Sequence, residues 1–274
     1  MVSIRELADL IIAAKEKLHK LPKFLELEAG SFAVIGDLHG DYLSLKQILE
    51  WLEHERPGAA IFLGDYIDRG GASLLVINEL FNRLVNEKMN YVLLRGNHEY
   101  IYRLPVWPHT LPLELQARLG EGWKTVYGLL LACFAELPLA CMLESCLCLH
   151  GGFPVIDSRA ATLAELRTGC LTEQENVVVQ VLYNDFSEML ENIAPSPRGA
   201  GYVVGWQPVR QFFRENKISV IFRGHQLFNK PAVKLFGKKI YSIMSCKNVY
   251  PEVLKKSAAI LVKPGKKFIK IVYF

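Results

Sequence analysis

Carboxylate, imidazole and amide side chains follow five short apolar runs in this chain, and glycine accompanies each group. The clusters, in chain order, are Gly36-Asp37-Leu38-His39-Gly40-Asp41, Gly64-Asp65-Tyr66-Ile67-Asp68-Arg69-Gly70, Arg95-Gly96-Asn97-His98-Glu99, His150-Gly151-Gly152 and Arg223-Gly224-His225. Ligands of an open α/β sheet bind at the carboxyl ends of its strands, so clusters that follow strands converge on one edge. Glycine allows the sharp turns that bring the backbone close to a ligand. The pattern therefore predicts one site assembled from several strand ends.

The side chains of these clusters predict a site for two metal ions. Carboxylates, imidazoles and an amide without cysteine suit first-row cations such as Mn²⁺, Fe or Zn²⁺ better than Mg²⁺ alone or a thiolate site. Two ions about 3.5–4 Å apart need a bridging carboxylate, and the central strand makes Asp65 its natural source. Asp37 and His39 stand two residues apart and can share one ion. The candidates for the other ion are Asn97, His150 and His225.

Each cluster also has an ordinary structural interpretation. A single Asp-x-His or Asp-Arg-Gly after a strand is usually a turn or a cap, and only the joint occurrence of all the clusters favours function. Asp41 fits a cap of the following helix as well as a place in the site. Glu99 is expected to anchor its loop, whereas His54 and His109 lie outside the clusters and are expected to be surface or loop residues.

Apolar periodicity predicts the elements that hold the clusters. Strands are expected over residues 31–35, 59–63, 91–94, 139–143, 146–149, 219–222, 232–236, 240–244, 258–262 and 268–273. Helices are expected over residues 3–19, 41–53, 72–87, 113–136, 163–168, 173–182 and 208–216, with loops over 104–113 and 194–201 and a turn at Pro264-Gly265. Alternating strands and helices with continuous apolar strands predict an α/β fold whose first sheet is buried on both faces.

The chain contains no repeat or linker that would divide it, so we expect a single domain over residues 1–274. Its expected parts are an N-terminal helix within 1–25, a motif-bearing core over 30–250 and C-terminal β strands over 251–274.

Composition is that of an ordinary globular protein, with 51% hydrophobic and 22% charged residues. The net charge of +4 is too small to predict a nucleic-acid partner. Charges throughout residues 1–25 argue against a secretion signal, and Glu136 and Pro138 interrupt the most apolar stretch, which argues against a membrane partner. Six cysteines without a framework spacing are expected to be buried free thiols in a reducing compartment, so we expect a cytoplasmic protein.

The clusters resemble the motifs of the phosphoprotein phosphatase family of serine/threonine phosphatases, within the wider metallophosphoesterases. Order and spacing agree at Gly-Asp-x-His-Gly (36–40), Gly-Asp-x-x-Asp-Arg-Gly (64–70), Gly-Asn-His-Glu (96–99), His-Gly-Gly (150–152) and Arg-Gly-His (223–225). The resemblance covers roughly residues 30–250 and is to the minimal prokaryotic or archaeal forms. It implies the calcineurin-like metallophosphoesterase fold, an α/β (α+β) class with a central β-sandwich flanked by helices, in place of a doubly wound sheet.

The resemblance also implies roles for individual residues. The first metal ion would be bound by Asp37, His39 and Asp65, and the second by Asp65, Asn97, His150 and His225. The substrate phosphate would be bound by Arg69 and Arg198 with Asn97. The general acid would be His98, held by Asp68. The implied cofactors are two divalent ions, with manganese expected first and iron or zinc as alternatives.

The implied activity is hydrolysis of phosphoserine and phosphothreonine in phosphoprotein substrates, by direct attack of a hydroxide held by two metal ions. One alternative is a related phosphohydrolase acting on dinucleoside polyphosphates or small phosphoesters, since such enzymes share the first three motifs. An alternative of another class is a non-catalytic scaffold that keeps the fold. The sequence identifies no regulatory subunit.

Two stretches depart from the family pattern. Residues 245–250 read SCKNVY where the family has Ser-Ala-Pro-Asn-Tyr-Cys. The tyrosine that often overhangs the family's site is therefore expected to be displaced or absent, and Cys246 is out of register. Tyr183-Asn184-Asp185 replaces the family's Trp-Ser-Asp, a change expected to alter the acidic groove.

Overall fold

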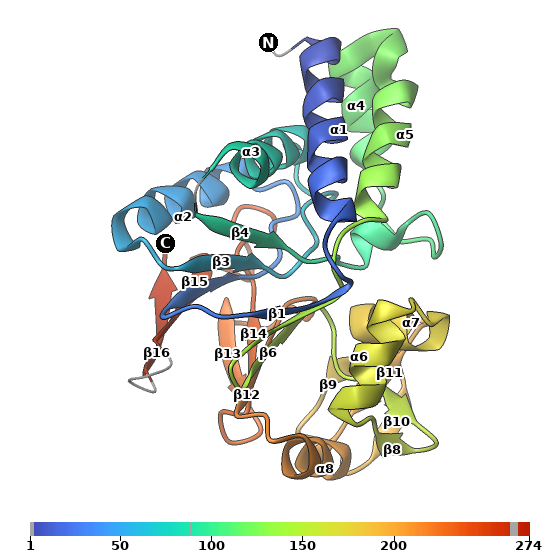
Figure 1. The fold of residues 1–274 in the computed structure, drawn as a ribbon, viewed down its shortest axis with the longest axis vertical. Helices are drawn as coiled ribbons and strands as arrows, with labels where there is room; N and C mark the ends of the chain where they lie inside the picture. The colour runs from blue at the N-terminus through green and yellow to red at the C-terminus, as the bar shows by residue number, and fades with distance from the viewer. Residues whose placement is uncertain (1–2, 88, 264–267) are drawn as a thin grey trace.

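The computed structural model describes residues 3–87, 89–263 and 268–274, and its two large β-sheets pack face to face with helices outside them (Figure 1). The fold is therefore a β-sandwich flanked by helices, as the family resemblance implied. The turn predicted at Pro264-Gly265 lies outside the described residues. All six cysteines are buried and unpaired, as predicted. Within the described ranges, none of the helices has both the length and the apolar character needed to cross a bilayer.

One sheet carries the first three clusters at its strand ends. Its strands, in spatial order, are β16 (Phe268–Tyr273), β15 (Ala258–Lys263), β2 (Phe32–Ile35), β3 (Ala59–Phe62) and β4 (Asn90–Leu93). β2, β3 and β4 are parallel, and β15 and β16 extend the sheet in antiparallel fashion. Every residue of β2 and β3 is buried, which explains their continuous apolar sequences.

The other large sheet carries the last two clusters. Its strands, in spatial order, are β1 (Phe24–Leu27), β5 (Ala140–Leu143), β6 (Cys146–Leu149), β12 (Val220–Arg223), β14 (Ile240–Ile243) and β13 (Ala232–Leu235). β6, β12 and β14 are parallel, while β5–β6 and β13–β14 form antiparallel hairpins. β1 was not expected from the sequence, because it is short and exists through parallel pairing with the distant β5.

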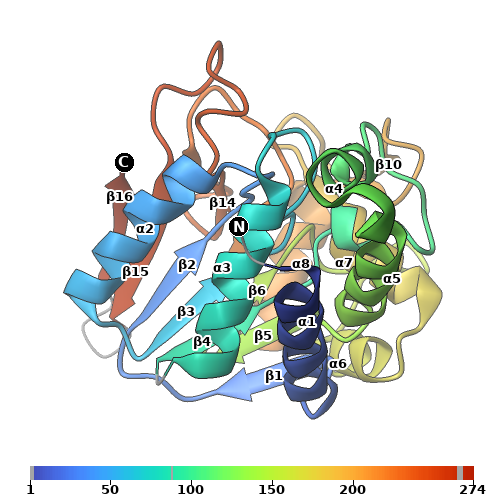
Figure 2. The same cartoon turned by 90° about the horizontal axis from the view of Figure 1, so that it is seen from above.

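Helices cover both outer faces of the sandwich (Figures 1 and 2). On the side of the five-stranded sheet they are α1 (Ile4–His19), α2 (Tyr42–Glu55), α3 (Ser73–Asn86), α4 (Leu111–Leu119) and α5 (Trp123–Phe134). On the side of the six-stranded sheet they are α6 (Leu163–Leu171), α7 (Glu175–Tyr183) and α8 (Trp206–Asn216). The large hydrophobic clusters form three layers, one on each outer face and one between the sheets.

Short elements complete the chain and lie mostly around the helices α6 to α8. They are the 3₁₀ turns η1 (His98–Tyr100) and η2 (Gly120–Gly122) and the strands β7 (Val155–Ile156), β8 (Arg159–Ala160), β9 (Asp185–Phe186), β10 (Ile193–Pro195) and β11 (Tyr202–Val204). β7 pairs with β8, and β11 pairs with both β9 and β10.

Three sequence-based boundaries are wrong. The single helix expected over 113–136 is two helices, because the chain turns at η2, where Gly120 adopts a φ of 57° that favours glycine. The loop expected over 104–113 is shorter, since α4 begins at Leu111. The loop expected over 194–201 includes the end of β10, whose pairing with β11 is a tertiary contact that local composition does not reveal.

The layer between the two sheets should be the most sensitive to truncation. Phe222 of β12 and Phe32 of β2 are fully buried, and their rings meet edge to face with centroids 6.3 Å apart. We expect Phe222→Ala to lower the free energy of unfolding by about 3–5 kcal/mol, because burial is lost and a cavity remains. Phe268→Ala, at a ring that is 45% exposed, is the matched control and should cost about 1 kcal/mol or less. Equal losses in urea denaturation would contradict this account of the core.

Candidate active site

The clusters meet at one edge of the sandwich, where strand ends from both large sheets face each other. The backbone amides of Leu38 and His39 donate to the Asp65 carbonyl at 3.0 and 2.8 Å, which joins the turns after β2 and β3. The His225 amide, after β12, donates to the Asp37 carboxylate at 2.9 Å. The single edge expected from the sequence thus forms between two sheets and not along one open sheet.

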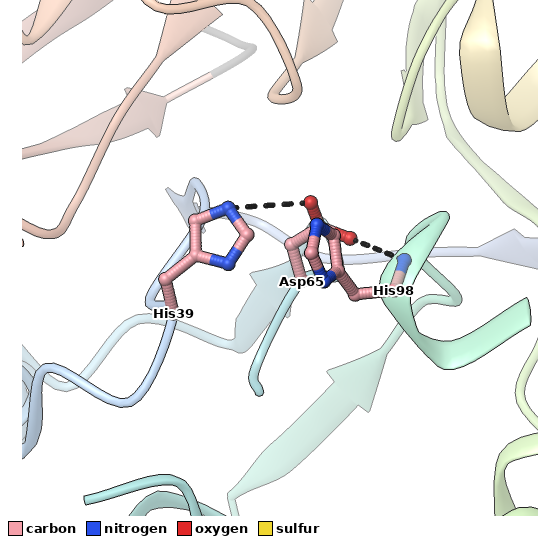
Figure 3. A group of neighbouring side chains, drawn as sticks. All are labelled: His39, Asp65 and His98. Atoms are coloured by element: carbon pink, nitrogen blue, oxygen red, sulfur yellow. Dashed lines mark hydrogen bonds and ion pairs between the residues drawn. The ribbon is translucent and has the colours of Figure 1, made fainter. Parts of the chain in front are cut away.

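The first group of potential metal ligands contains His39, Asp65 and His98 (Figure 3), and Asp37 lies beside His39. The Nδ1 of His39 lies 2.9 Å from the Ile67 carbonyl, so the ring proton is donated there and Nε2 carries a lone pair. This Nε2 lies 3.4 Å from Oδ2 of Asp65 and 3.7 Å from Oδ2 of Asp37. Burial lowers the pKa of His39 to about 3, so the imidazole is neutral and suited to bind a cation.

The second group surrounds the Asn97 carboxamide. Its Oδ1 lies 3.0 Å from Nε2 of His150 and 2.9 Å from Nδ1 of His225. His150 donates from Nδ1 to the Leu63 carbonyl at 2.9 Å, and its Nε2 also lies 3.5 Å from Oδ1 of Asp65. Burial lowers the pKa of His150 to about 4, so this imidazole is also neutral. Asp65 therefore faces both groups of ligands.

The donor set fits divalent cations, because the lone pairs of His39 Nε2 and His150 Nε2 face carboxylate oxygens with no proton between them. His39 Nε2 and His225 Nε2 are buried and have no hydrogen-bond partner among the described residues. Burial and the neighbouring Asp65 charge raise the pKa of Asp37 to about 8, as expected for two carboxylates that are buried close together. Buried lone pairs and carboxylates of this kind are stabilised by metal coordination.

The backbone of the site is strained at several of these residues. His39, Asp65, Asp68, Arg69 and His225 have φ values of 45°, 55°, 70°, 67° and 64°. Non-glycine residues rarely adopt this region, and each such conformation costs on the order of 1–3 kcal/mol. A concentration of them in one place is typical of functional sites.

Glu99 holds the strained turn after β3, which is the anchoring role expected of it. Its fully buried carboxylate accepts hydrogen bonds from the amides of Asp65 and Tyr66, both at 2.8 Å, and from the Gly96 amide at 2.9 Å. These bonds join the turns after β3 and β4. They fix the position of Asp65 through its backbone.

Asp68 is saturated with hydrogen-bond donors. Its Oδ2 lies 2.7 Å from Nδ1 of His98 and 3.0 Å from Nδ1 of His109, and its Oδ1 accepts from the amides of Thr110 and Leu111. The histidine bonds lower the pKa of Asp68 against the opposing effect of burial, so it is a carboxylate. His109 lies in the loop before α4, as expected, but its contact with Asp68 also makes it part of the site. Its other ring nitrogen lies 2.9 Å from the Tyr127 hydroxyl, so it links Asp68 to α5.

Arg69 lies beside Tyr250, which sequence comparison expected to be displaced or absent. The Tyr250 hydroxyl accepts a hydrogen bond from Arg69, and its ring stands edge-on to His39 with centroids 6.4 Å apart. Asn248 fixes this C-terminal loop by donating to Asp41, which also caps α2. The tyrosine is therefore displaced in sequence but present at the site, while Cys246 is fully buried.

Arg198 approaches from the other half of the sandwich. Its Nε donates to Oδ2 of Asp185 at 2.8 Å, and the buried Arg223 donates to Oδ1 of the same carboxylate at 3.3 Å. Asp185 Oδ1 also lies 3.8 Å from Nε2 of His225. Asp185 thus links Arg198 to the second group of ligands. The sequence held one signal for this role, since Asp185 is the residue that the stretch 183–185 shares with the family's Trp-Ser-Asp.

The sequence pattern of calcineurin-like phosphoesterases matches residues 30–228. The chain therefore belongs to the calcineurin-like phosphoesterase family. Within that class, the serine/threonine-protein phosphatase 6 catalytic subunit of Caenorhabditis elegans is 29% identical over 216 residues, which are 78% of this chain and 64% of that protein. These similarities confirm the resemblance to the phosphoprotein phosphatases that the motifs indicated.

Solved structures show the same fold. A Saccharomyces cerevisiae protein serine/threonine phosphatase with similarity to human phosphatase PP5 superposes with a TM-score of 0.86 at 23% identity, over 100% of this chain and 90% of that chain. A cold-active protein-tyrosine phosphatase of a psychrophilic Shewanella superposes with a TM-score of 0.63 at 14% identity, over 93% of this chain and 84% of that chain.

Gly96 is a position where the site tolerates no side chain. A Cβ there would lie 2.2 Å from both the amide nitrogen and Oδ1 of Asp65. We expect Gly96→Ala to displace Asp65 and to lower the free energy of unfolding by about 3 kcal/mol. Gly128→Ala is the matched control, since its Cβ in α5 would meet nothing within 4 Å, and it should stabilise the protein by about 0.5–1 kcal/mol. In both thermal and urea unfolding, Gly96→Ala should lower the stability and Gly128→Ala should raise it. A change of the same sign in the two variants would contradict the prediction.

Proposed function

We propose that this protein is a metal-dependent protein serine/threonine phosphatase, which hydrolyses phosphoserine and phosphothreonine in phosphoprotein substrates. The observation that carries the proposal is the convergence of unprotonated nitrogens and carboxylate oxygens around Asp65. Arginines and the hydrogen-bonded pair of His98 and Asp68 lie around these atoms. Because ligands come from both large sheets, we propose that residues 1–274 act as one catalytic domain.

Two divalent cations fit this donor set, and we propose manganese, with iron or zinc as alternatives. The proposed ligands are Asp37, His39 and Asp65 for one ion, and Asp65, Asn97, His150 and His225 for the other. When bound, such a pair supplies an activated water as the nucleophile and neutralises charge on the phosphoryl oxygens. The backbone carbonyls of Ile67 and Leu63 fix the tautomers of His39 and His150, so each presents Nε2.

Arg69 and Arg198 would bind the phosphoryl oxygens of the substrate. Guanidinium groups stay charged and offer paired donors that match phosphate geometry. Each is already oriented, Arg69 by Tyr250 and Arg198 by Asp185, so less side-chain entropy is lost on binding. Asn97 directs its Oδ1 toward the two histidines, which leaves its amide Nδ2 as a further donor to phosphate.

His98 would protonate the leaving alkoxide of the serine or threonine. Its Nδ1 is engaged by Asp68, so the proton is delivered from Nε2 as the phosphorus–oxygen bond to the side chain breaks. The saturated Asp68 carboxylate cannot turn away, and it holds the ring in this orientation. His98 also lies near His39 and Asp65, close enough to serve as a ligand, but the bond to Asp68 and the family motif favour the role of acid.

The proposed activity is tested with metal-stripped protein to which Mn²⁺ is restored. We expect turnover of a phosphoserine or phosphothreonine peptide to depend on Mn²⁺ and to exceed turnover of diadenosine tetraphosphate by at least about tenfold in kcat/KM, which corresponds to about 1.4 kcal/mol of transition-state discrimination. Preference for the dinucleotide would replace the proposal with the alternative phosphohydrolase. Two bound ions without turnover of either substrate would favour the non-catalytic scaffold.

The variant Asp65→Asn tests the proposal that Asp65 is a ligand of both metal ions. Loss of the shared carboxylate should reduce binding at both ion positions and abolish turnover, because one residue serves both. Elemental analysis that still finds two ions per chain would contradict the bridging role.

Replacement of His98 by alanine should affect substrates according to their leaving group. We expect His98→Ala to lower kcat on phosphoserine peptide by about 10²–10⁴-fold, since an alkoxide needs a proton, and to affect p-nitrophenyl phosphate far less. His54→Ala, at an exposed histidine of α2, is the control and should change neither rate. Equal losses on both substrates, or loss of a metal ion, would show that His98 is not the acid.

A further inference from the structure

The hydroxyl of Tyr183 is a buried polar group with no hydrogen-bond partner in the part of the chain that the structure describes. The residue ends α7 and is 5% exposed. Among the described residues, the buried side-chain nitrogen and oxygen atoms that lack a hydrogen-bond partner are His39 Nε2, Arg95 Nε, Tyr183 Oη and His225 Nε2. His39 Nε2 faces the ligands proposed for the first ion. His225 Nε2 is the nitrogen of its ring that does not face Asn97, and it lies 3.8 Å from Oδ1 of Asp185. The Tyr183 hydroxyl belongs to the same part of the molecule and needs an explanation of its own.

The ring of Tyr183 lies at the edge of the second ligand group. It meets the His225 ring edge-on, with centroids 6.0 Å apart and an interplanar angle of 75°. The Asn97 side chain is a polar neighbour of the hydroxyl, and the charges of Asp65 and Arg198 are close enough to act on it. The hydroxyl thus belongs to a side chain that is close to the proposed ion ligands and to the proposed phosphate arginine.

Neighbouring protein groups do not use the phenolic proton. The Asn97 Oδ1 already faces His150 and His225, and an approach of its Nδ2 would occupy only the acceptor side of the hydroxyl. A buried hydroxyl without a partner lowers stability, and a phenylalanine at this position would avoid that cost. The hydroxyl is therefore arranged for an acceptor that arrives with a ligand.

The groups around the Tyr183 hydroxyl indicate which kind of acceptor it would bind. A neutral phenol is a poor ligand for a cation, and the nearby carboxylates and imidazoles already supply better ones. Phosphoryl oxygens are strong acceptors, and the proposed function places them beside Arg198 and Asn97. We propose that the Tyr183 hydroxyl donates a hydrogen bond to a phosphoryl oxygen of the substrate, as an uncharged donor beside Arg198. This inference rests on the proposed function for the identity of its ligand.

The test compares wild-type protein with Tyr183→Phe, both loaded with Mn²⁺, and inorganic phosphate is the probe. Calorimetric titration should show a phosphate Kd that is about ten- to one-hundredfold weaker in the variant, the expected loss for a hydrogen bond to a charged group. Metal content should stay at the wild-type value. Without phosphate, the Tm of the variant should equal or exceed that of the wild type, because an unpaired hydroxyl has been removed. Added phosphate should raise the Tm less in the variant than in the wild type.

Tyr241→Phe is the matched control. Tyr241 is also 5% exposed, but it lies in β14 and packs on Phe222 between the sheets, so its hydroxyl should not affect phosphate affinity. A phosphate Kd within twofold of wild type in Tyr183→Phe would overturn the inference. Loss of a bound ion in that variant would also overturn it, because the hydroxyl would then serve the cation. If the wild type hydrolyses no phosphoester and yet Tyr183→Phe weakens phosphate binding, the proposed function fails and this inference stands.

Discussion

The buried carboxylate of Asp65 has neutral imidazole nitrogens on both of its sides, with His39 Nε2 at 3.4 Å and His150 Nε2 at 3.5 Å. Neither nitrogen carries a proton that it can share, because both rings donate their protons to backbone carbonyls. In a medium of low dielectric constant such an arrangement is costly unless positive charge is supplied. Much of the surrounding structure serves to keep these atoms in place despite that cost.

The sandwich provides the rigidity that the site requires. Strained backbone conformations at His39, Asp65 and His225 persist only where surrounding contacts over-determine them. The buried Glu99 supplies part of that constraint by joining the turns after β3 and β4. Hydrophobic layers on both faces of each large sheet supply the rest, since strands buried on both sides cannot shift their register.

Side chains around the centre are oriented by partners from distant parts of the chain. Tyr250 and Asp185 orient the two arginines, and His109 reaches Asp68 from the loop before α4. Preorganised donors of this kind lose little entropy when they meet a phosphate and do not have to reorganise as charge moves. The arrangement therefore suits the proposed phosphatase chemistry, whereas metal storage would not require oriented phosphate donors.

The sequence alone predicted most strands of both large sheets, because buried parallel strands have continuous apolar sequences. It also predicted the residues that follow them, since glycine-flanked polar clusters at strand ends stand out from ordinary turns. The helices 3–19, 41–53 and 72–87 followed from apolar periodicity and differ from α1, α2 and α3 by only a few residues. The break in the helix expected over 113–136 was not predicted, because the apolar periodicity continues through residues 120–122. In the structure, the glycines at 120 and 122 nevertheless form a turn there.

Amino-acid types and their spacing determined which groups could bind metal and phosphate, because those properties belong to single residues and short turns. Only the tertiary structure decided that the strand ends come from two facing sheets and that His109 and Tyr250 belong to the site. It also decided that the Tyr183 hydroxyl has no hydrogen-bond partner among the described residues. Those facts depend on which distant segments lie side by side and on how much solvent they exclude. Local sequence carries no record of either, since both arise only when the two halves of the sandwich close on each other.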